Sequence, residues 1–129
     1  MLAIDSNVLV RFVTGDHPEQ SPRARTLILS SAIHVSHTVM LESEWVLRSV
    51  YGFTRPDTIR ALRAFAGLPL VAAQDPPLLA HALDLAEDGM DFADALHLAA
   101  ADGCDALVTF DRKFISRAKG RSTIPVREP

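Results

Sequence analysis

Cysteine is almost absent from this 129-residue chain, which contains Cys104 alone. A single cysteine cannot form an internal disulfide, so the small secreted proteins that depend on a disulfide framework are excluded and a reducing cytoplasm is the expected location. We expect Cys104 to fill space beside a strand as a small side chain. The first residues lack the basic segment of a signal peptide, and no apolar run is long enough to cross a bilayer.

Several kinds of chemistry also lack their usual residues. No Ser–His or Cys–His arrangement for nucleophilic catalysis stands out, and no glycine-rich loop is present to hold phosphates. Internal repeats and low-complexity tracts are missing, while hydrophobic residues make up 48% of the chain and charged residues 22%. This composition favours a folded protein over a disordered one. The length suffices for one hydrophobic core, so we expect a single domain over residues 1–129.

The charges are unevenly distributed along the chain. The net charge of −3, from 13 basic and 16 acidic residues, does not by itself suggest a nucleic-acid partner. No Lys or Arg occurs between Ala64 and Asp111, however, and this stretch is rich in aspartate. Basic residues follow at once, from Arg112 to Arg127, with no acid among them. The pattern predicts an acidic site beside a basic rim.

Apolar spacing predicts short strands that alternate with helices. Strands are expected over residues 2–5, 33–36, 68–73, 105–110 and 123–127, and helices over residues 7–13, 21–30, 38–51, 54–66, 76–87, 92–101 and 111–118. The strands at 2–5 and 105–110 look buried, and Ser6 and Ser21 are expected to cap the helices that follow them. Such alternation predicts an α/β fold whose parallel sheet is covered by helices on both faces.

Four carboxylates follow or interrupt apolar segments, where an ionised side chain is unfavourable without compensation. They are Asp5, Glu42, Asp94 and Asp111. Asp5 and Asp111 end predicted strands, and ligands of α/β proteins bind at the carboxyl ends of the strands. If all four acids converge, they require a cation, and oxygen ligands favour Mg²⁺ or Mn²⁺ over zinc. Such a site suits the hydrolysis of phosphodiesters.

Each acid also has a simpler interpretation. Asp5 and Asp111 could cap the helices that they precede, and Asp91 is as suited to capping a helix as to binding a ligand. Glu42 has a rival in Glu44, which we expect to face solvent or to form a salt bridge.

Other polar and aromatic residues near these acids have simple explanations too. His97 lies one helical turn after Asp94, where we expect a packed histidine with a partner rather than a metal ligand. His37 lies near a strand end and is expected in a loop, and Thr109 is suited to a strand as a β-branched residue. Trp45 is expected in the core or on a dimer surface. The basic run has two interpretations: a solvated face, or, beside a phosphodiester site, a surface that contacts phosphates.

Four segments resemble the motifs of the PIN-domain family, in the family's order and spacing. They are Asp5-Ser6-Asn7-Val8-Leu9 and residues 35–42, 94–101 and 108–114. Together they extend over nearly the whole chain, and the short length resembles the VapC-type toxins of type II toxin–antitoxin systems. The resemblance implies a three-layer α/β/α PIN-like fold with a short, mainly parallel central sheet.

The same resemblance implies a function and roles for matching residues. It implies a cytoplasmic endoribonuclease that depends on Mg²⁺ or Mn²⁺, acts as a toxin, forms a homodimer, does not bind membranes and is inhibited by a cognate antitoxin protein. The metal ligands, direct or through water, would be Asp5, Glu42, Asp94 and Asp111. The supporting residues would be Asn7, Asp91 and Thr109. The residues that contact RNA would be Arg112, Lys113, Arg117 and Lys119.

Two other functions remain open from the sequence. A phosphotransfer domain could use a strand-end Asp as its nucleophile, but such a site usually needs a nearby Lys, and none occurs between Ala64 and Asp111. A non-catalytic PIN-like module that binds RNA or protein would be expected to have lost some of the four acids, all of which are present.

Overall fold

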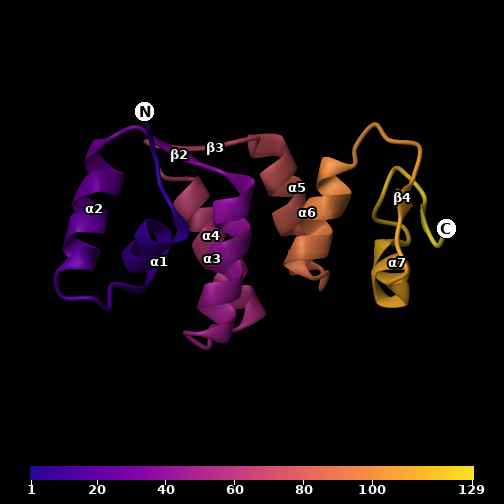
Figure 1. Cartoon of the computed structure of the whole chain (residues 1–129), viewed down its shortest axis with the longest axis horizontal. Coiled ribbons are helices and arrows are strands. Elements are labelled where there is room, and N and C mark those ends of the chain that lie inside the picture. Colours follow the sequence, from indigo (N-terminus) through magenta and orange to yellow (C-terminus); the bar gives the residue numbers. More distant parts are fainter. The chain divides into compact units, whose positions relative to one another are not determined.

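The computed structural model describes residues 1–129, in which seven helices alternate with short strands (Figure 1). All strand pairs are parallel, so the predicted α/β fold with a short parallel sheet is confirmed. The chain divides into two compact units, Met1–Pro76 and Pro77–Pro129. A single domain over residues 1–129 stays a prediction. None of the helices combines the length and the apolar character needed to cross a membrane.

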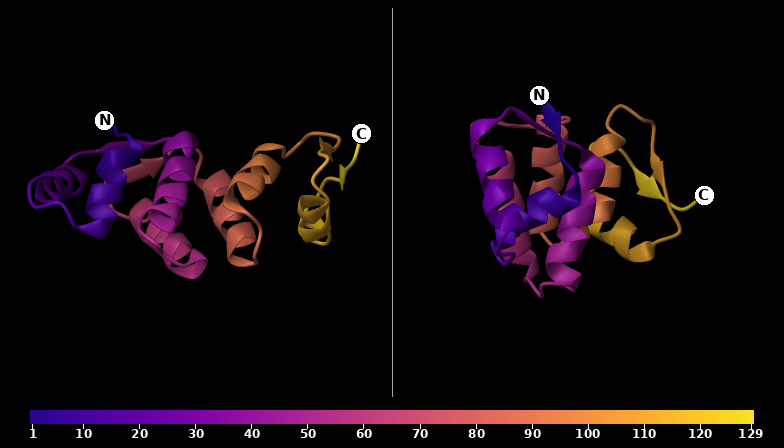
Figure 2. Two further views of the ribbon diagram at one scale, coloured as in Figure 1. Left: turned by 60° about the horizontal axis from the view of Figure 1, so that its bottom comes forward. Right: turned by 60° about the vertical axis from the view of Figure 1, so that its left-hand side comes forward.

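The first unit contains a three-stranded parallel sheet in the order β1-β2-β3. Its strands are β1 (Leu2–Ala3), β2 (Ile33–Val35) and β3 (Val71–Ala73). Its helices are α1 (Ser6–Thr14), α2 (Gln20–Ser30), α3 (His37–Ser49) and α4 (Arg55–Ala66). Helix α1 packs against α2 and α3, and α3 packs against α4, as the two views of Figure 2 also show. The carboxyl ends of β1 and β2 therefore lie where α1 and α3 begin.

The core of this unit joins the central strand to the helices. Ile33 and Val35 of β2 are fully buried, as are Leu9 of α1 and Met40 of α3. Phe65 of α4 is also buried and meets Phe12 of α1 edge-on, with ring centroids 5.7 Å apart. Burial of this apolar surface is the main force that holds α1 and α3 against the sheet.

Helix boundaries in this unit follow from local capping groups. Thr54 caps α4 by accepting the N–H of Asp57, and Gly15 ends α1 in the left-handed conformation, with φ of 63°. Two predicted caps are wrong. Asp5, not Ser6, caps α1, because the Asp5 carboxylate accepts the N–H of Val8. Helix α2 begins at Gln20, so Ser21 lies within it and accepts the N–H of His17 instead.

The second unit consists of three helices and a two-stranded parallel sheet. Its helices are α5 (Pro76–Glu87), which starts at the junction of the units, α6 (Phe92–Ala100) and α7 (Arg112–Ala118). Its strands are β4 (Leu107–Val108) and β5 (Val126–Arg127), which lie side by side in Figure 2. Phe92 and Leu98 of α6 and Phe114 of α7 are buried.

The expected burial of two strands is wrong. Strand β4 is only two residues long, and Val108 and Phe110 are 51% and 81% exposed. In β1, Leu2 and Ala3 are exposed, and the first buried residue is Ile4. Each of these strands has a single hydrogen-bonded neighbour in its own unit. Cys104 is exposed as well and does not fill space beside a strand.

Candidate functional site

Asp5 and Glu42 are linked by the serine between the strand and the first helix. Asp5 follows β1, is exposed, and accepts the backbone N–H of Val8 at 3.2 Å through Oδ1. The hydroxyl of Ser6, a buried residue, donates to Oε1 of Glu42 on α3. Because Ser6 directly follows Asp5, this bond brings the segments that carry the two acids together at the carboxyl ends of β1 and β2.

Glu44, the rival of Glu42, has a different environment. It is buried, and its carboxylate accepts two hydrogen bonds from Arg48, at 2.5 Å from Nε and 3.2 Å from Nη2. The predicted alternative of a salt bridge is confirmed, and that of a solvent-facing side chain is wrong. The Arg one turn later neutralises this buried carboxylate, which would otherwise be an uncompensated buried charge. Glu42, by contrast, is exposed, and its Oε1 accepts a hydrogen bond from Ser6.

Asp91 and Asp94 occupy the start of α6 in the second unit. Oδ1 of Asp91 accepts the N–H of Asp94 at 3.1 Å, so Asp91 is the N-cap of the helix. Capping was one of the two roles predicted for Asp91. Burial raises the pKa of the Asp94 carboxyl, and the negative charges of Asp91 and Asp111 raise it further. His97 acts in the opposite direction but is exposed, so the expected packed histidine is wrong. Asp94 thus lies close to two other negative charges.

Asp111 is held rigidly at the start of α7. Its Oδ1 accepts the N–H groups of Lys113 and Phe114, at 2.9 and 3.1 Å. Thr109 supports the same turn, since its hydroxyl oxygen accepts the N–H of Asp111 at 3.0 Å. The expected capping role of Asp111 is confirmed. Thr109, whose simpler interpretation was a β-branched strand residue, also accepts a hydrogen bond in this turn. These bonds use one carboxylate oxygen of Asp111, so Oδ2 accepts none of them.

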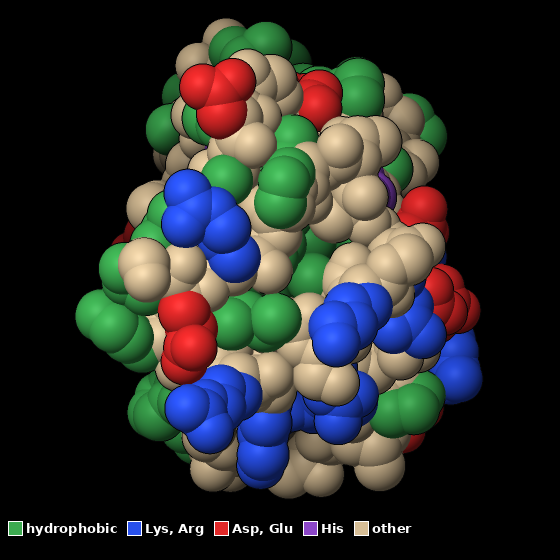
Figure 3. All heavy atoms as spheres, turned by 90° about the vertical axis from the view of Figure 1, so that its right-hand side faces the viewer, with side chains coloured by type: hydrophobic (Ala, Val, Ile, Leu, Met, Phe, Trp, Pro, Cys, Tyr) green, Lys and Arg blue, Asp and Glu red, His purple; other side chains and the backbone are tan.

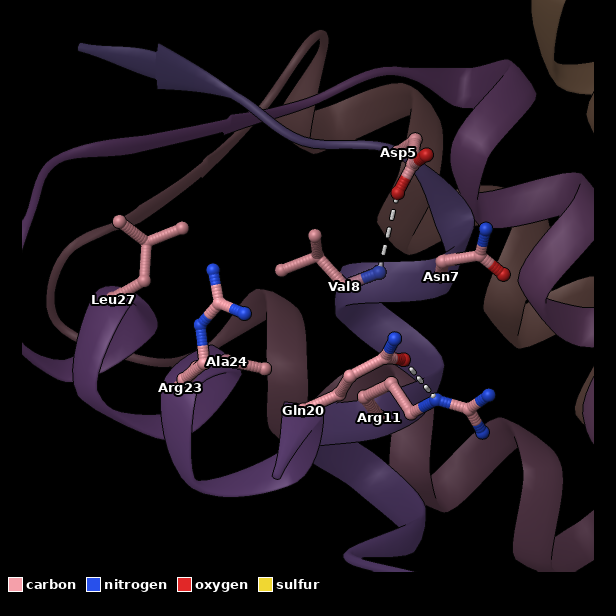
Figure 4. A pocket seen from close by; sticks show the side chains of 8 residues that line it. All are labelled: Asp5, Asn7, Val8, Arg11, Gln20, Arg23, Ala24 and Leu27. Atoms are coloured by element: carbon pink, nitrogen blue, oxygen red, sulfur yellow. Dashed lines mark hydrogen bonds between the residues drawn. The ribbon is translucent and has the colours of Figure 1, made fainter. Parts of the chain in front are cut away.

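Asn7 is exposed on the first turn of α1 and lines a pocket of about 530 Å³ between α1 and α2. Asp5 lines the same pocket, as do the basic residues Arg11 and Arg23 (Figure 4). A pocket of this volume lies in the range that admits small ligands.

The PIN domain family model matches residues 2–120, which covers both units apart from their outermost residues. The chain belongs to the PIN-domain family. No curated protein matches it. The PIN domain is a nuclease-type fold, and the mixed α/β structure with its small parallel sheet is consistent with the three-layer fold of the family.

PIN domains are in general metal-dependent nucleases that act on RNA or other nucleic acids. The acids of this PIN domain fit a hard divalent cation, because their donors are all carboxylate oxygens and a cation would relieve the repulsion at Asp94. Neither unit by itself brings three His, Cys, Asp or Glu side chains into a group that could hold a metal ion. In the first unit Ser6, the neighbour of Asp5, binds Glu42, and in the second unit the charges of Asp91 and Asp111 act on Asp94.

Basic side chains surround α7 of this PIN domain. Figure 3 shows Lys and Arg side chains gathered in the lower half of one face. The four predicted RNA contacts are all exposed; they are Arg112, Lys113, Arg117 and Lys119. Arg112 lies 3.4 Å from Glu128, and Arg117 donates to the carbonyl oxygen of Gly89 at 2.7 Å. Lys113 and Lys119 form no hydrogen bond or ion pair through their side chains, so their charges face solvent.

Three residues of this PIN domain differ wholly or in part from what the sequence predicted. Ser6 donates to Glu42, although Ser6 was expected only as a cap; its place inside the first motif was the available signal. Trp45 is 56% exposed, which excludes the core and leaves the dimer surface as a prediction. His37 is the first residue of α3 rather than a loop residue, and its Nε2 is buried without a hydrogen-bond partner.

Proposed function

We propose that this PIN domain is a metal-dependent endoribonuclease that acts as the toxin of a toxin–antitoxin pair. The observation that supports it most is the crowding of negative charge at Asp94, by Asp91 and Asp111, in a chain matched by the PIN family over residues 2–120. Uncompensated carboxylates raise the free energy of the folded protein. A bound cation would offset this cost, which would explain why the carboxylates occupy the motif positions of the family.

The proposed metal ligands are the four acids of the motifs, directly or through water. They are Asp5, Glu42, Asp94 and Asp111. A bound Mg²⁺ or Mn²⁺ would acidify a water molecule and stabilise negative charge on the phosphate and the leaving oxygen. The protein would orient the ligands: Ser6 holds Glu42, and Thr109 with the first amides of α7 holds Asp111. Asp91 would support Asp94 through the start of α6, and Asn7 would contact substrate beside Asp5.

The proposed substrate is RNA, and the proposed phosphate contacts lie on and after α7. They are Arg112, Lys113, Arg117 and Lys119. Lys113 lies in the turn that Asp111 caps, so a cation adjoins a proposed metal ligand. Such contacts hold the backbone of a nucleic acid without reading its sequence. Affinity should therefore depend on salt more than on the bases.

The toxin role, the cytoplasmic location, the antitoxin partner and the homodimer are proposals drawn from the resemblance to VapC-type toxins. An antitoxin that inhibits by offering an Arg to the acids would compete with the metal, because a guanidinium matches two carboxylate oxygens at once. Inhibition should then weaken as Mg²⁺ or Mn²⁺ rises.

Expression in a bacterial host tests the toxin role. The parent protein should arrest growth and the D94N variant, produced at the same soluble level, should not; the cognate antitoxin should relieve the arrest. Harmless expression of folded parent protein in several hosts would contradict the role. Two other results would favour the alternatives: a phosphoenzyme trapped on Asp5 would indicate phosphotransfer, and RNA binding without cleavage would indicate a binding module.

A further inference from the structure

The pocket between α1 and α2 has an apolar surface and a polar rim. Val8 from α1 and Leu27 from α2 give it an apolar surface, and Asp5 and Asn7 stand at its rim (Figure 4). A second depression shares Arg23 and Leu27 with it and continues along α2. The pocket therefore begins at a proposed metal ligand and leads away from it over apolar side chains, all within the first unit.

The two arginines that line this pocket differ in what they bind. Arg11 is engaged by three neighbours: its Nε donates to Gln20 at 2.9 Å, and its Nη1 donates to the Tyr51 hydroxyl at 2.8 Å and lies 3.6 Å from Asp16. Figure 4 shows its guanidinium turned away from the pocket.

Arg23 has neither an ion pair nor a side-chain hydrogen bond, and it is exposed. In Figure 4 its guanidinium points from α2 into the space between Val8 and Leu27. Arg11 thus joins the helices, whereas the charge of Arg23 is free to bind an anion.

We propose that this pocket binds one nucleotide of the RNA substrate next to the scissile phosphodiester, with Arg23 paired to a phosphate and Val8 and Leu27 packed against the base or ribose. This inference rests on the proposed ribonuclease function, because it takes Asp5 to mark the reacting phosphate. Single-stranded RNA exposes both the charged backbone and the flat faces of its bases, and proteins bind it by combining guanidinium groups with apolar contacts.

The chemistry of the pocket favours RNA over a peptide. A strand whose phosphate lies at Asp5 has another phosphate at every neighbouring nucleotide, so an anion is always available to Arg23. A peptide offers an acid only where its sequence provides one. The guanidinium, with its planar fork of donors, matches the oxygens of a phosphate.

Matched variants on α2 test this assignment. R23Q removes the free charge inside the pocket, and R25Q removes an exposed charge from the same helix but outside the pocket lining. L27A shortens an apolar side chain of the pocket, and L29A shortens a leucine that is 46% exposed on the same helix but outside the pocket lining.

Binding of a fluorescent single-stranded RNA is measured by anisotropy in EDTA at several salt concentrations, and cleavage is measured as kcat and KM with Mn²⁺. Melting temperatures verify that each variant is folded.

R23Q should weaken binding about tenfold and reduce the salt slope by about 0.7, the value for one phosphate contact on a single strand. KM should rise with little change in kcat, because the contact holds substrate before and during the reaction alike. L27A should weaken binding without changing the salt slope. R25Q and L29A should behave like the parent.

Failure of this inference can be told from failure of the proposed function. If the parent cleaves RNA but R23Q and L27A match their controls, the pocket assignment is overturned and the ribonuclease stands. If R23Q and L27A weaken only the binding of an antitoxin, the pocket is a protein-binding groove and the assignment is also overturned. If the parent neither binds nor cleaves RNA, the proposed function itself fails, and the pocket assignment fails with it.

Discussion

The hydroxyl of Ser6 donates a hydrogen bond to Oε1 of Glu42, which lies 36 residues later on a different helix. Ser6 is buried while Glu42 is exposed, so the bond ties an exposed carboxylate to a buried residue of the fold. The same serine directly follows Asp5. One hydroxyl thus fixes where the acid of α3 stands relative to the acid that follows β1.

Removal of this hydroxyl should weaken metal binding. S6A should lower the affinity for Mn²⁺ by about tenfold, the lower end of the effect of losing a partner that orients a ligand. It should cost about 1 kcal/mol of unfolding free energy, the typical value of one hydrogen bond. S49A, on an exposed serine of α3, is the control. Calorimetric titration and urea unfolding measure the two effects, and an S6A protein that binds Mn²⁺ as S49A does would refute the role of Ser6.

Asp111 should show two separable roles, because its carboxylate caps α7 and is also a proposed metal ligand. D111N keeps an oxygen that can accept the N–H groups of Lys113 and Phe114 but loses the charge. D111A loses both, and should cost about 1 kcal/mol of stability, as the loss of a helix cap does.

We therefore expect D111N to unfold like the parent in urea but to lose cleavage, and D111A to lose both stability and cleavage. If D111N cleaves RNA at the parent rate, Asp111 is a cap and not a ligand.

Asp94 should make the stability of the metal-free protein depend on pH. Burial and the charges of Asp91 and Asp111 raise its pKa above the ordinary 3.8, so the folded state retains a proton at pH values where the unfolded chain has released it. Stability must then fall as pH rises from about 3.8 through the raised pKa, and the loss persists at higher pH. D94N carries no such charge and escapes this loss.

Melting curves of metal-free parent and D94N across this pH range should show the difference shifting in favour of D94N as pH rises. At neutral pH the variant should be equally or more stable. Added Mn²⁺ should stabilise the parent more than D94N, because only the parent keeps the full ligand set. A large loss of melting temperature in metal-free D94N at neutral pH would mean that Asp94 is structural.

Local signals explain why most helices could be predicted from the sequence. Thr54, Pro56 and Gly67 mark the ends of α4, and the structure places α4 between Thr54 and Gly67. A cap bond spans three or four residues, so the sequence contains all of its participants. Asp91 and Asp111 were expected as caps for the same reason.

Features that depend on distant parts of the chain could not be predicted. Phe110 follows an apolar run and yet is 81% exposed, because burial depends on which elements cover a strand. The bond from Ser6 to Glu42 joins separate helices, and no local spacing signals it. Arg23 belongs to no motif; only the packing of α1 against α2 shows that its charge faces a pocket. The four acids were found by their positions after or within apolar segments and by motif order, and their shared binding of a metal stays a prediction.

Cleavage of single-stranded RNA by purified, EDTA-stripped protein tests the central claim most directly. The parent should be inactive in EDTA, should become active when Mg²⁺ or Mn²⁺ is added, and should lose activity again on chelation, while D94N from the same purification stays inactive throughout. Cleavage by the parent that survives thorough chelation, or D94N that cleaves at the parent rate, would contradict a metal-dependent ribonuclease built on these carboxylates.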